Sequence, residues 1–262
     1  LLNFSMSAAV ALCYSGAAGF HGAVSAPARQ RSVVMETKAE LVDLAKQLNP
    51  VIGYWDPLKL ADSNFWNQGE EFTIGWLRES EVKHGRIAMF GFIGYIVHEN
   101  GIRTPDGIAN LVSTDLSAPA VWDAIPEIGK WQIVLFVGLM DIWRESKVTL
   151  AGDGQKHYTK GGKIGYFPTF KMLPHPVPFD LFRPFGPSFR SSEEEKAKGR
   201  IAEINNGRLA MLGLFGFLSE ATVPGSVPAL TGLVKPYTGE VMAPFASNVF
   251  ALDAAQSVMP GF

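Results

Sequence analysis

A segment of 14 residues occurs twice in the chain, and this duplication constrains the fold more than any other feature of the sequence. The first copy reads EVKHGRIAMFGFIG from Glu81, and the second reads EINNGRLAMLGLFG from Glu203, 122 residues later. Seven positions are identical, and no gap is needed to align them. Such self-similarity indicates an internal duplication. We therefore expect two similar helices that are related by a pseudo-twofold axis.

Hydrophobic periodicity and helix stop signals divide the rest of the chain into helices and connections. Long helices are expected at about 74–99, 128–147 and 194–221, so that each copy of the repeat lies within one of them. A short amphipathic helix is expected at 38–48 and a short apolar one at 245–255.

Composition excludes several classes of protein. The net charge of −2 gives a nucleic-acid partner no electrostatic support. Cys13 is the only cysteine, which excludes disulfides and cysteine-rich metal sites. Residues 148–192 are rich in glycine, proline and aromatic side chains and are expected to form a long loop, which is uncommon unless it is functional or packed on a partner.

The charges of the repeat decide whether these helices can lie in a membrane, because no stretch offers 18 uncharged apolar residues. Glu81 and Arg86 lie about 140° apart around a helix and cannot readily pair with each other. Two crossed copies could pair reciprocally, Glu81 with Arg208 and Glu203 with Arg86, and no charge would then be stranded in hydrocarbon. We therefore predict an all-α membrane protein with three transmembrane helices, the first and third forming a crossed pair.

Each copy of the repeat also carries a neutral donor beside its carboxylate. His84 follows Glu81 by three positions on one helical face, as Asn206 follows Glu203. The magnesium of a chlorophyll needs one axial ligand, and a neutral nitrogen or oxygen donor or an arginine-compensated carboxylate suits it. The glycines of the repeat leave flat helix surfaces that would admit macrocycles and polyenes.

These segments resemble the paired signature of the chlorophyll a/b- and a/c-binding light-harvesting proteins. GYWDPLKLAD at 53–62 is similar to the stromal pre-helix motif of that family, where a carotenoid end group docks, and PFDLFRPFG at 178–186 is similar to its second copy. The resemblance covers about residues 50–222, and GWLRESEVKHGRIAM resembles the red-lineage branch. It implies a non-catalytic antenna that binds chlorophyll a, chlorophyll c and carotenoids, namely peridinin or fucoxanthin with diadinoxanthin.

The resemblance also implies roles for individual residues. Arg86 and Arg208 match the ion-pair partners, and Arg144 matches a local counterion of Asp141. Glu220 stands where the family often has a glutamine ligand, and the sequence shows no partner for it. The implied magnesium ligands are Glu81, His84, Gln132, Asp141, Glu203, Asn206 and Glu220.

Targeting and orientation can also be predicted. Residues 1–35 combine an apolar stretch with a basic, acid-poor one, as in the two-part leader of plastids gained by secondary endosymbiosis; the alternative is a disordered N-terminus. The three-helix domain would then be 36–262. One basic residue lies in 101–127 and ten lie in 147–200. Basic loops stay on the side of insertion, which places the N-terminus and the long loop in the stroma, and 101–127 and the C-terminus in the thylakoid lumen.

Two other functions are alternatives to light harvesting for a photosystem core. A photoprotective quencher of the same family should show clustered lumenal carboxylates, whereas those of 101–127 are spread along the loop. A di-metal membrane enzyme would need a second Glu-x-x-His, where this chain has Asn206. We expect a photosystem core as partner, photosystem I in preference to II, with neighbouring antenna proteins and thylakoid lipids. His98, His157 and His175 are expected to be solvated.

Overall fold

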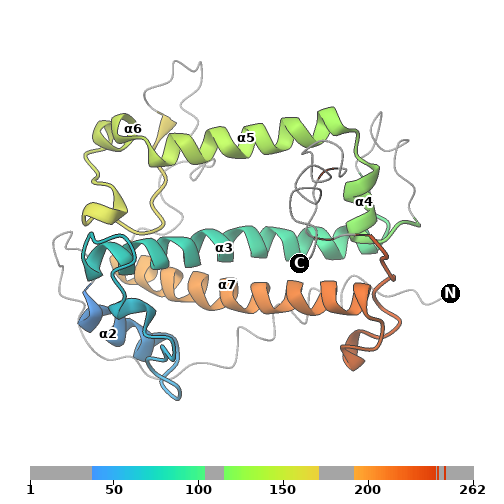
Figure 1. Ribbon diagram of the computed structural model, residues 1–262, viewed down its shortest axis with the longest axis horizontal. Helices are drawn as coiled ribbons and strands as arrows, with labels where there is room; N and C mark the ends of the chain where they lie inside the picture. Colours follow the sequence, from blue (N-terminus) through green and yellow to red (C-terminus); the bar gives the residue numbers. More distant parts are fainter. Residues whose placement is uncertain (1–36, 104–114, 171–191, 240, 242–244, 246–262) are drawn as a thin grey trace, which may run out of the picture. The chain divides into compact units, whose positions relative to one another are not determined.

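The computed structural model describes residues 37–103, 115–170 and 192–239, together with Val241 and Phe245, and this part of the chain is helical without strands (Figure 1). The α-helices are α2 (Lys38–Leu48), α3 (Glu70–Glu99), α4 (Ala118–Ala124), α5 (Glu127–Glu145), α6 (Lys147–Gly152) and α7 (Glu193–Thr222). Short 3-10 helices are η1 (Leu60–Asp62), η3 (Tyr158–Lys160) and η5 (Pro228–Leu230).

The three long helices predicted from the sequence are confirmed as α3, α5 and α7. Helix α3 begins four residues earlier than expected, with Glu70 and Glu71 in its first turn, where carboxylates stabilise a helix. Helix α5 ends at Glu145 because Ser146 has extended backbone angles, φ −67° and ψ 127°. The expectation of a structureless connection over 148–192 is wrong for its first part, which contains α6 and η3.

Several predicted features lie outside the described residues. They are the leader at 1–35, His175, the second pre-helix motif at 178–186 and, apart from Phe245, the helix at 245–255.

The amphipathic helix α2 has the bounds expected from its sequence and is capped at its start. The Thr37 hydroxyl accepts the backbone N–H of Glu40, and the Glu40 carboxylate accepts that of Thr37, both at 3.4 Å. This reciprocal cap satisfies two N–H groups that a helix start leaves unpaired. Asn205 of α7 donates to the backbone oxygen of Leu48 at 3.3 Å and thereby ties the end of α2 to the duplicated helix pair.

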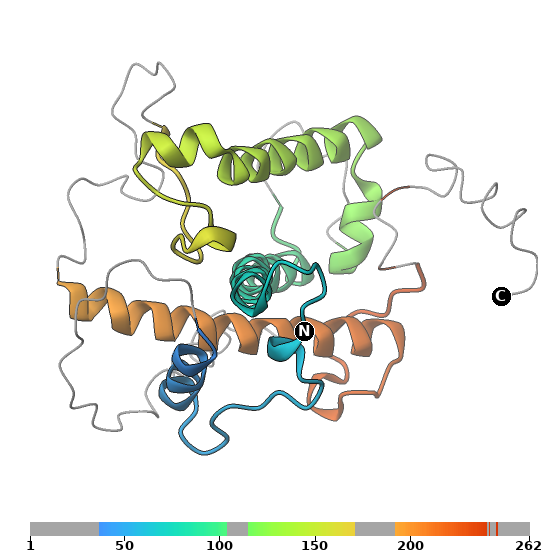
Figure 2. The ribbon, with the colours of Figure 1, turned by 60° about the vertical axis from the view of Figure 1, so that its left-hand side comes forward.

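Helices α3 and α7 cross, and they touch backbone to backbone at one point. In Figure 2, α3 is seen almost along its axis while α7 runs across the view. Gly85 and Gly207 meet at the crossing, and a Cβ atom on Gly207 would lie 2.9 Å from the Cα of Gly85. These glycines occupy equivalent positions of the repeat, so the crossing point lies on the predicted pseudo-twofold axis. Phe217 stacks on Phe92 and Tyr95 beyond it, with ring centroids 5.0 and 4.9 Å apart.

Helix α5 is apolar and exposed around its whole circumference. All residues from 131 to 139 are exposed, and Phe136 and Ile142 reach 63% and 68% exposure. Its polar contacts with α3 are confined to its last turns, where Lys83 of α3 reaches Asp141 and Glu145. In the described part of the chain, no helix has both the length and the apolar character needed to cross a membrane.

Candidate functional site

The crossing of α3 and α7 contains both reciprocal ion pairs that the repeat predicts. Nε of Arg86 lies 2.5 Å from Oε1 of Glu203, and Nε of Arg208 lies 2.6 Å from Oε1 of Glu81. Both carboxylates are partly buried, with side chains 31% and 23% exposed. Each charge is thus compensated across the pseudo-twofold axis, and the paired carboxylate oxygens keep further lone pairs for another ligand.

The two pairs are not equivalent, because Glu81 has a second partner. Arg78, three residues earlier on α3, donates to its Oε2. Sequence reasoning missed this contact, although the i, i+3 spacing signals it. Arg200 stands at the equivalent position of α7 and lines an open hollow with Glu203. Arg86 has a second contact of its own, donating to the backbone oxygen of Gly165 at 2.7 Å.

His84 lies on the outer face of α3 with its ring orientation fixed. Its Nδ1 is 2.8 Å from the backbone oxygen of Ser80, four residues earlier. A proton on Nδ1 donated to that carbonyl leaves the lone pair of the other ring nitrogen, Nε2, directed outwards. Asn206 is likewise exposed at the equivalent position of α7. Each helix therefore presents a neutral donor beside a compensated carboxylate.

The ion pairs around Asp141 differ from those that the resemblance implies. Arg144 contacts Glu79 of α3 rather than Asp141, and its Nε donates to the backbone oxygen of Tyr166 at 3.1 Å. The expected local counterion is therefore wrong. Glu79 is only 2% exposed, so leaving its carboxylate unpaired would cost more free energy than leaving the carboxylate of the exposed Asp141 unpaired. Lys83 is the counter-charge of Asp141 instead, with its Nζ 2.7 Å from Oδ1 of Asp141.

The connection after α6 is fastened to this cluster. Nε2 of His157 lies 2.7 Å from Oε2 of Glu145, and its Nδ1 lies 2.7 Å from the Thr159 hydroxyl. The expectation that His157 is solvated is therefore wrong. Glu79 accepts the backbone N–H of Gly165 at 2.7 Å. Burial raises the pKa of the Tyr158 phenol, which lies in the same connection.

Glu220 has a structural role that its sequence context did not reveal. Its two carboxylate oxygens accept the backbone N–H groups of Gly225 at 2.9 Å and Val227 at 2.8 Å, and the residue is 3% exposed. The carboxylate thus caps the turn that follows α7. Gln132 is exposed on α5. The ligand roles expected for Glu220 and Gln132 stay predictions.

The turn at 53–62 is organised by one carboxylate. Asp56 accepts the backbone N–H groups of Leu60 and Ala61 and the hydroxyl of Tyr54, each at 3.0 Å. The N–H of Ala61 contributes most to holding the pKa of Asp56 below its usual value, and the other two donors lower it further. Trp55 remains 76% exposed, so the turn presents an aromatic face that nothing in the described chain covers.

Among the described residues, no group of three or more histidine, cysteine, aspartate or glutamate side chains is placed to hold a metal ion. The donors at the crossing are single side chains spaced along two helices. Such donors suit a metal that already carries most of its ligands.

Comparisons with known proteins agree with this arrangement. Residues 41–222 match the family model described as chlorophyll A-B binding protein. The chain is 30% identical over 230 residues to a fucoxanthin-chlorophyll a-c binding protein of Trieres chinensis, covering 85% of this chain and 98% of the relative. It is 33% identical over 174 residues to fucoxanthin-chlorophyll a-c binding protein A of Phaeodactylum tricornutum, covering 64% and 73%. The names of both relatives describe them as chloroplastic.

Proposed function

This chain belongs to the chlorophyll A-B binding protein family, and on that premise we propose that it is a light-harvesting antenna for chlorophyll a, chlorophyll c and fucoxanthin or a related carotenoid. The family binds pigments and does not catalyse a reaction. Bound chlorophyll supplies light absorption and the onward transfer of excitation energy. The protein's own part is to hold the pigments at fixed distances and orientations.

The reciprocal ion pairs carry this proposal. They leave Glu81 and Glu203 compensated, so each can serve as an axial ligand without adding charge to a pigment site. His84 and Asn206 add one neutral donor on each helix. The further ligands would be Gln132 and Asp141 on α5, with Lys83 as the counter-charge of Asp141.

The exposed apolar surface of α5 supports a membrane location. Large apolar side chains exposed on every side of a helix are unfavourable in water. Lipid on the outer side and pigments on the side of α3 and α7 would cover them.

We infer that α3, α5 and α7 span the thylakoid membrane of a plastid, with the 148–192 connection on the stromal side. We further infer that excitation passes to a photosystem core, photosystem I in preference to II.

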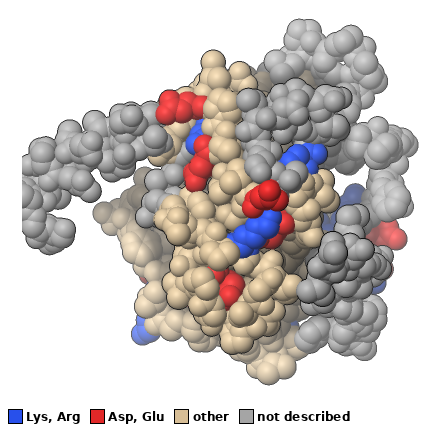
Figure 3. All heavy atoms as spheres, turned by 90° about the vertical axis from the view of Figure 1, so that its right-hand side faces the viewer, with Lys and Arg blue, Asp and Glu red and all other residues tan. Residues whose placement is uncertain are grey.

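The arrangement at the α4 end favours harvesting over quenching. Asp123 accepts the Tyr237 hydroxyl at 2.6 Å, and Glu99 accepts the backbone N–H groups of Ala118 and Lys235 at 2.9 and 2.5 Å. On the face shown in Figure 3, acidic side chains of the described residues are scattered over a mostly uncharged surface. These acidic residues do not form a cluster of carboxylates that would take up protons together.

Pigment extraction from the purified protein, followed by time-resolved fluorescence, tests the proposal. We expect chlorophyll a, chlorophyll c and a carotenoid in fixed ratios, and a nanosecond-scale chlorophyll lifetime that acid does not shorten. A lifetime that collapses on acidification would favour the quencher. A structured protein without pigment would refute both functions.

A further inference from the structure

The two carboxylates at the crossing occupy equivalent positions of the repeat, but they are held by different numbers of cations. We propose that Arg78 makes Glu81 the weaker of the two magnesium ligands, so that the chlorophyll on Glu81 is released before the chlorophyll on Glu203. The inference rests on the proposed function, in which both carboxylates are axial ligands. It assigns to Arg78 the difference in affinity between two sites that the repeat makes alike.

Glu81 uses both of its carboxylate oxygens on guanidinium groups. Oε1 lies 2.6 Å from Nε of Arg208, and Oε2 accepts from Nη1 of Arg78. Each of these charge-assisted hydrogen bonds takes up a lone pair that a metal ion would otherwise use. Arg78 is only 6% exposed, so little water screens its charge. Two positive charges against one negative charge therefore face a magnesium ion at this site, which weakens its binding.

Glu203 keeps one carboxylate oxygen for a pigment. Its Oε1 lies 2.5 Å from Nε of Arg86, and Arg86 also donates to the backbone oxygen of Gly165, so its charge is shared between two acceptors. Among the described residues, no second hydrogen-bond donor reaches Glu203. Its side chain is 31% exposed, against 23% for Glu81. Oε2 of Glu203 thus keeps both of its lone pairs for a magnesium ion.

The packing around each helix explains why Arg78 is paired and its counterpart on α7, Arg200, is not. The 3-10 helix η3 packs against α3 one turn before Arg78, where a Cβ atom on Gly75 would lie 3.1 Å from the backbone oxygen of Tyr158. Arg200 is exposed and lines an open hollow. A buried guanidinium needs a counter-charge, and the nearby carboxylate supplies it. An exposed guanidinium can stay hydrated.

A second guanidinium could also strengthen a ligand by fixing the orientation of its side chain. Arg208 already anchors Glu81 across the crossing, so a second anchor adds little order. It does remove a lone pair and add a positive charge, and we expect these two effects to prevail. The alternatives predict opposite results when Arg78 is replaced, because lost orientation would speed the release of the chlorophyll and a regained lone pair would slow it.

Arg78→Met tests the inference in the full-length protein assembled with chlorophyll a, chlorophyll c and carotenoid. Glu81→Gln and Glu203→Gln each alter one axial ligand and therefore identify the absorption band of one chlorophyll. After dilution of the parent into excess detergent, we expect the band assigned to Glu81 to disappear first. In Arg78→Met it should disappear about tenfold more slowly, as expected for one charge-assisted hydrogen bond. Arg200→Met is the matched control and should not slow the release of either chlorophyll.

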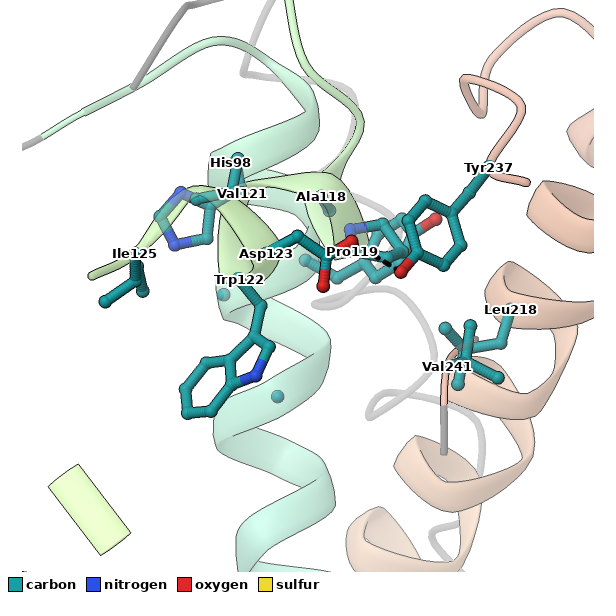
Figure 4. Close-up of a pocket in the computed structure, with 13 residues that line it drawn as sticks. His98, Ala118, Pro119, Val121, Trp122, Asp123, Ile125, Leu218, Tyr237 and Val241 are labelled. Carbon is teal, nitrogen blue, oxygen red and sulfur yellow. Dashed lines mark hydrogen bonds between the residues drawn. The ribbon is translucent and has the colours of Figure 1, made fainter. Parts of the chain in front are cut away.

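Tyr237→Phe separates a general loosening of the fold from the effect of Arg78. The Tyr237 hydroxyl donates to Asp123 at 2.6 Å at the α4 end of α3 (Figure 4), near His98, which is half-buried rather than solvated as expected. Loss of this bond removes no charge from either ligand, so the order of release should stay the same. A reversed order in Tyr237→Phe would show that release reports the stability of the fold and would overturn the ranking.

Unchanged or faster loss of the Glu81 band in Arg78→Met would also overturn the inference. If that variant does not assemble, the parent protein decides, because loss of the Glu203 band before the Glu81 band contradicts the ranking. Protein that binds no chlorophyll, or in which neither glutamine variant moves a band, would instead refute the proposed function and its ligands.

Discussion

Gly85 and Gly207 bring the backbones of α3 and α7 into direct contact at equivalent positions of the repeat. A Cβ atom on Gly85 would lie 3.1 Å from the Cα of Gly207, and one on Gly207 would lie 2.9 Å from the Cα of Gly85. The neighbouring ion pairs bridge the helices through Arg86 and Arg208, which follow these glycines directly in the sequence. The distance between the backbones therefore determines how far each arginine side chain must extend to reach its carboxylate on the other helix.

Gly207→Ala should push the two helices apart. Overpacking a close contact costs about 1–3 kcal/mol, and here both ion pairs lengthen as well. We expect a lower midpoint of thermal unfolding, measured by the loss of visible circular dichroism. Gly138→Ala on α5 is the matched control, because a Cβ there meets nothing within 4 Å. Equal midpoints for the two variants would contradict the close contact.

Arg86→Leu should destabilise the protein more than Arg208→Leu. Removing Arg86 strands Glu203, whereas Glu81 keeps Arg78 when Arg208 is lost. Stranding a buried carboxylate costs about 3 kcal/mol or more, and the partial exposure of these side chains reduces that figure. The yield of assembled, pigmented protein and its unfolding midpoint measure the difference. The reverse order would show that Arg78 does not compensate Glu81.

The helix pair could be predicted because the same sequence segment occurs twice in the chain. Duplication identifies equivalent residues, and the cost of stranded charge then dictates that Glu81 pairs with Arg208 and Glu203 with Arg86. The bounds of α2 were predicted from its local amphipathic pattern, and the structure adds a capping box formed by Thr37 and Glu40 at its start. In each case the information lies in one segment or in two copies of it.

The contacts of α5 could not be predicted in this way. Glu79 and Lys83 of α3 have no charged counterparts in α7, where Ile201 and Asn205 stand at the equivalent positions. No symmetry argument therefore points to them. The family resemblance implied an Asp141–Arg144 pair. In the structure Arg144 contacts the buried Glu79 instead, because an unpaired buried charge costs more than an unpaired exposed one.

The effects of substituting Lys83 and Asp141 on stability should be coupled, whereas those of substituting Arg144 and Asp141 should not be. In a double-mutant cycle, Lys83→Met and Asp141→Asn are expected to show an interaction energy of about 0.5–1 kcal/mol, since Asp141 is half exposed. The cycle of Arg144→Met with Asp141→Asn should give a value near zero. Unfolding midpoints of the single and double variants supply both numbers. A larger interaction energy between Arg144 and Asp141 would show that Arg144 is the counterion of Asp141.

Acid should loosen the turn at 53–62 through Asp56. Its backbone and hydroxyl donors hold its pKa below the ordinary value of 3.8, so the folded state favours the ionised form. The stability that Asp56 contributes is therefore fully present above the unfolded pKa and is lost as pH falls through the lowered folded pKa. Asp56→Asn should be less stable than the parent at neutral pH, and the difference should shrink below about pH 3.8. A difference independent of pH would argue against this role.

His84→Ala should remove one chlorophyll and leave a folded protein. The imidazole is exposed, and its hydrogen bond to the Ser80 carbonyl orients the ring without supporting other elements. Its loss therefore removes a donor rather than a structural contact, in contrast to Arg86→Leu, which strands a charge. Pigment extraction gives the chlorophyll count, and the unfolding midpoint reports the fold. His84→Gln is the control, since an amide oxygen at that position can still reach a magnesium ion and should retain the pigment. Loss of assembly in His84→Ala, or an unchanged count in it, would show that the side chain serves another purpose on the outer face of α3.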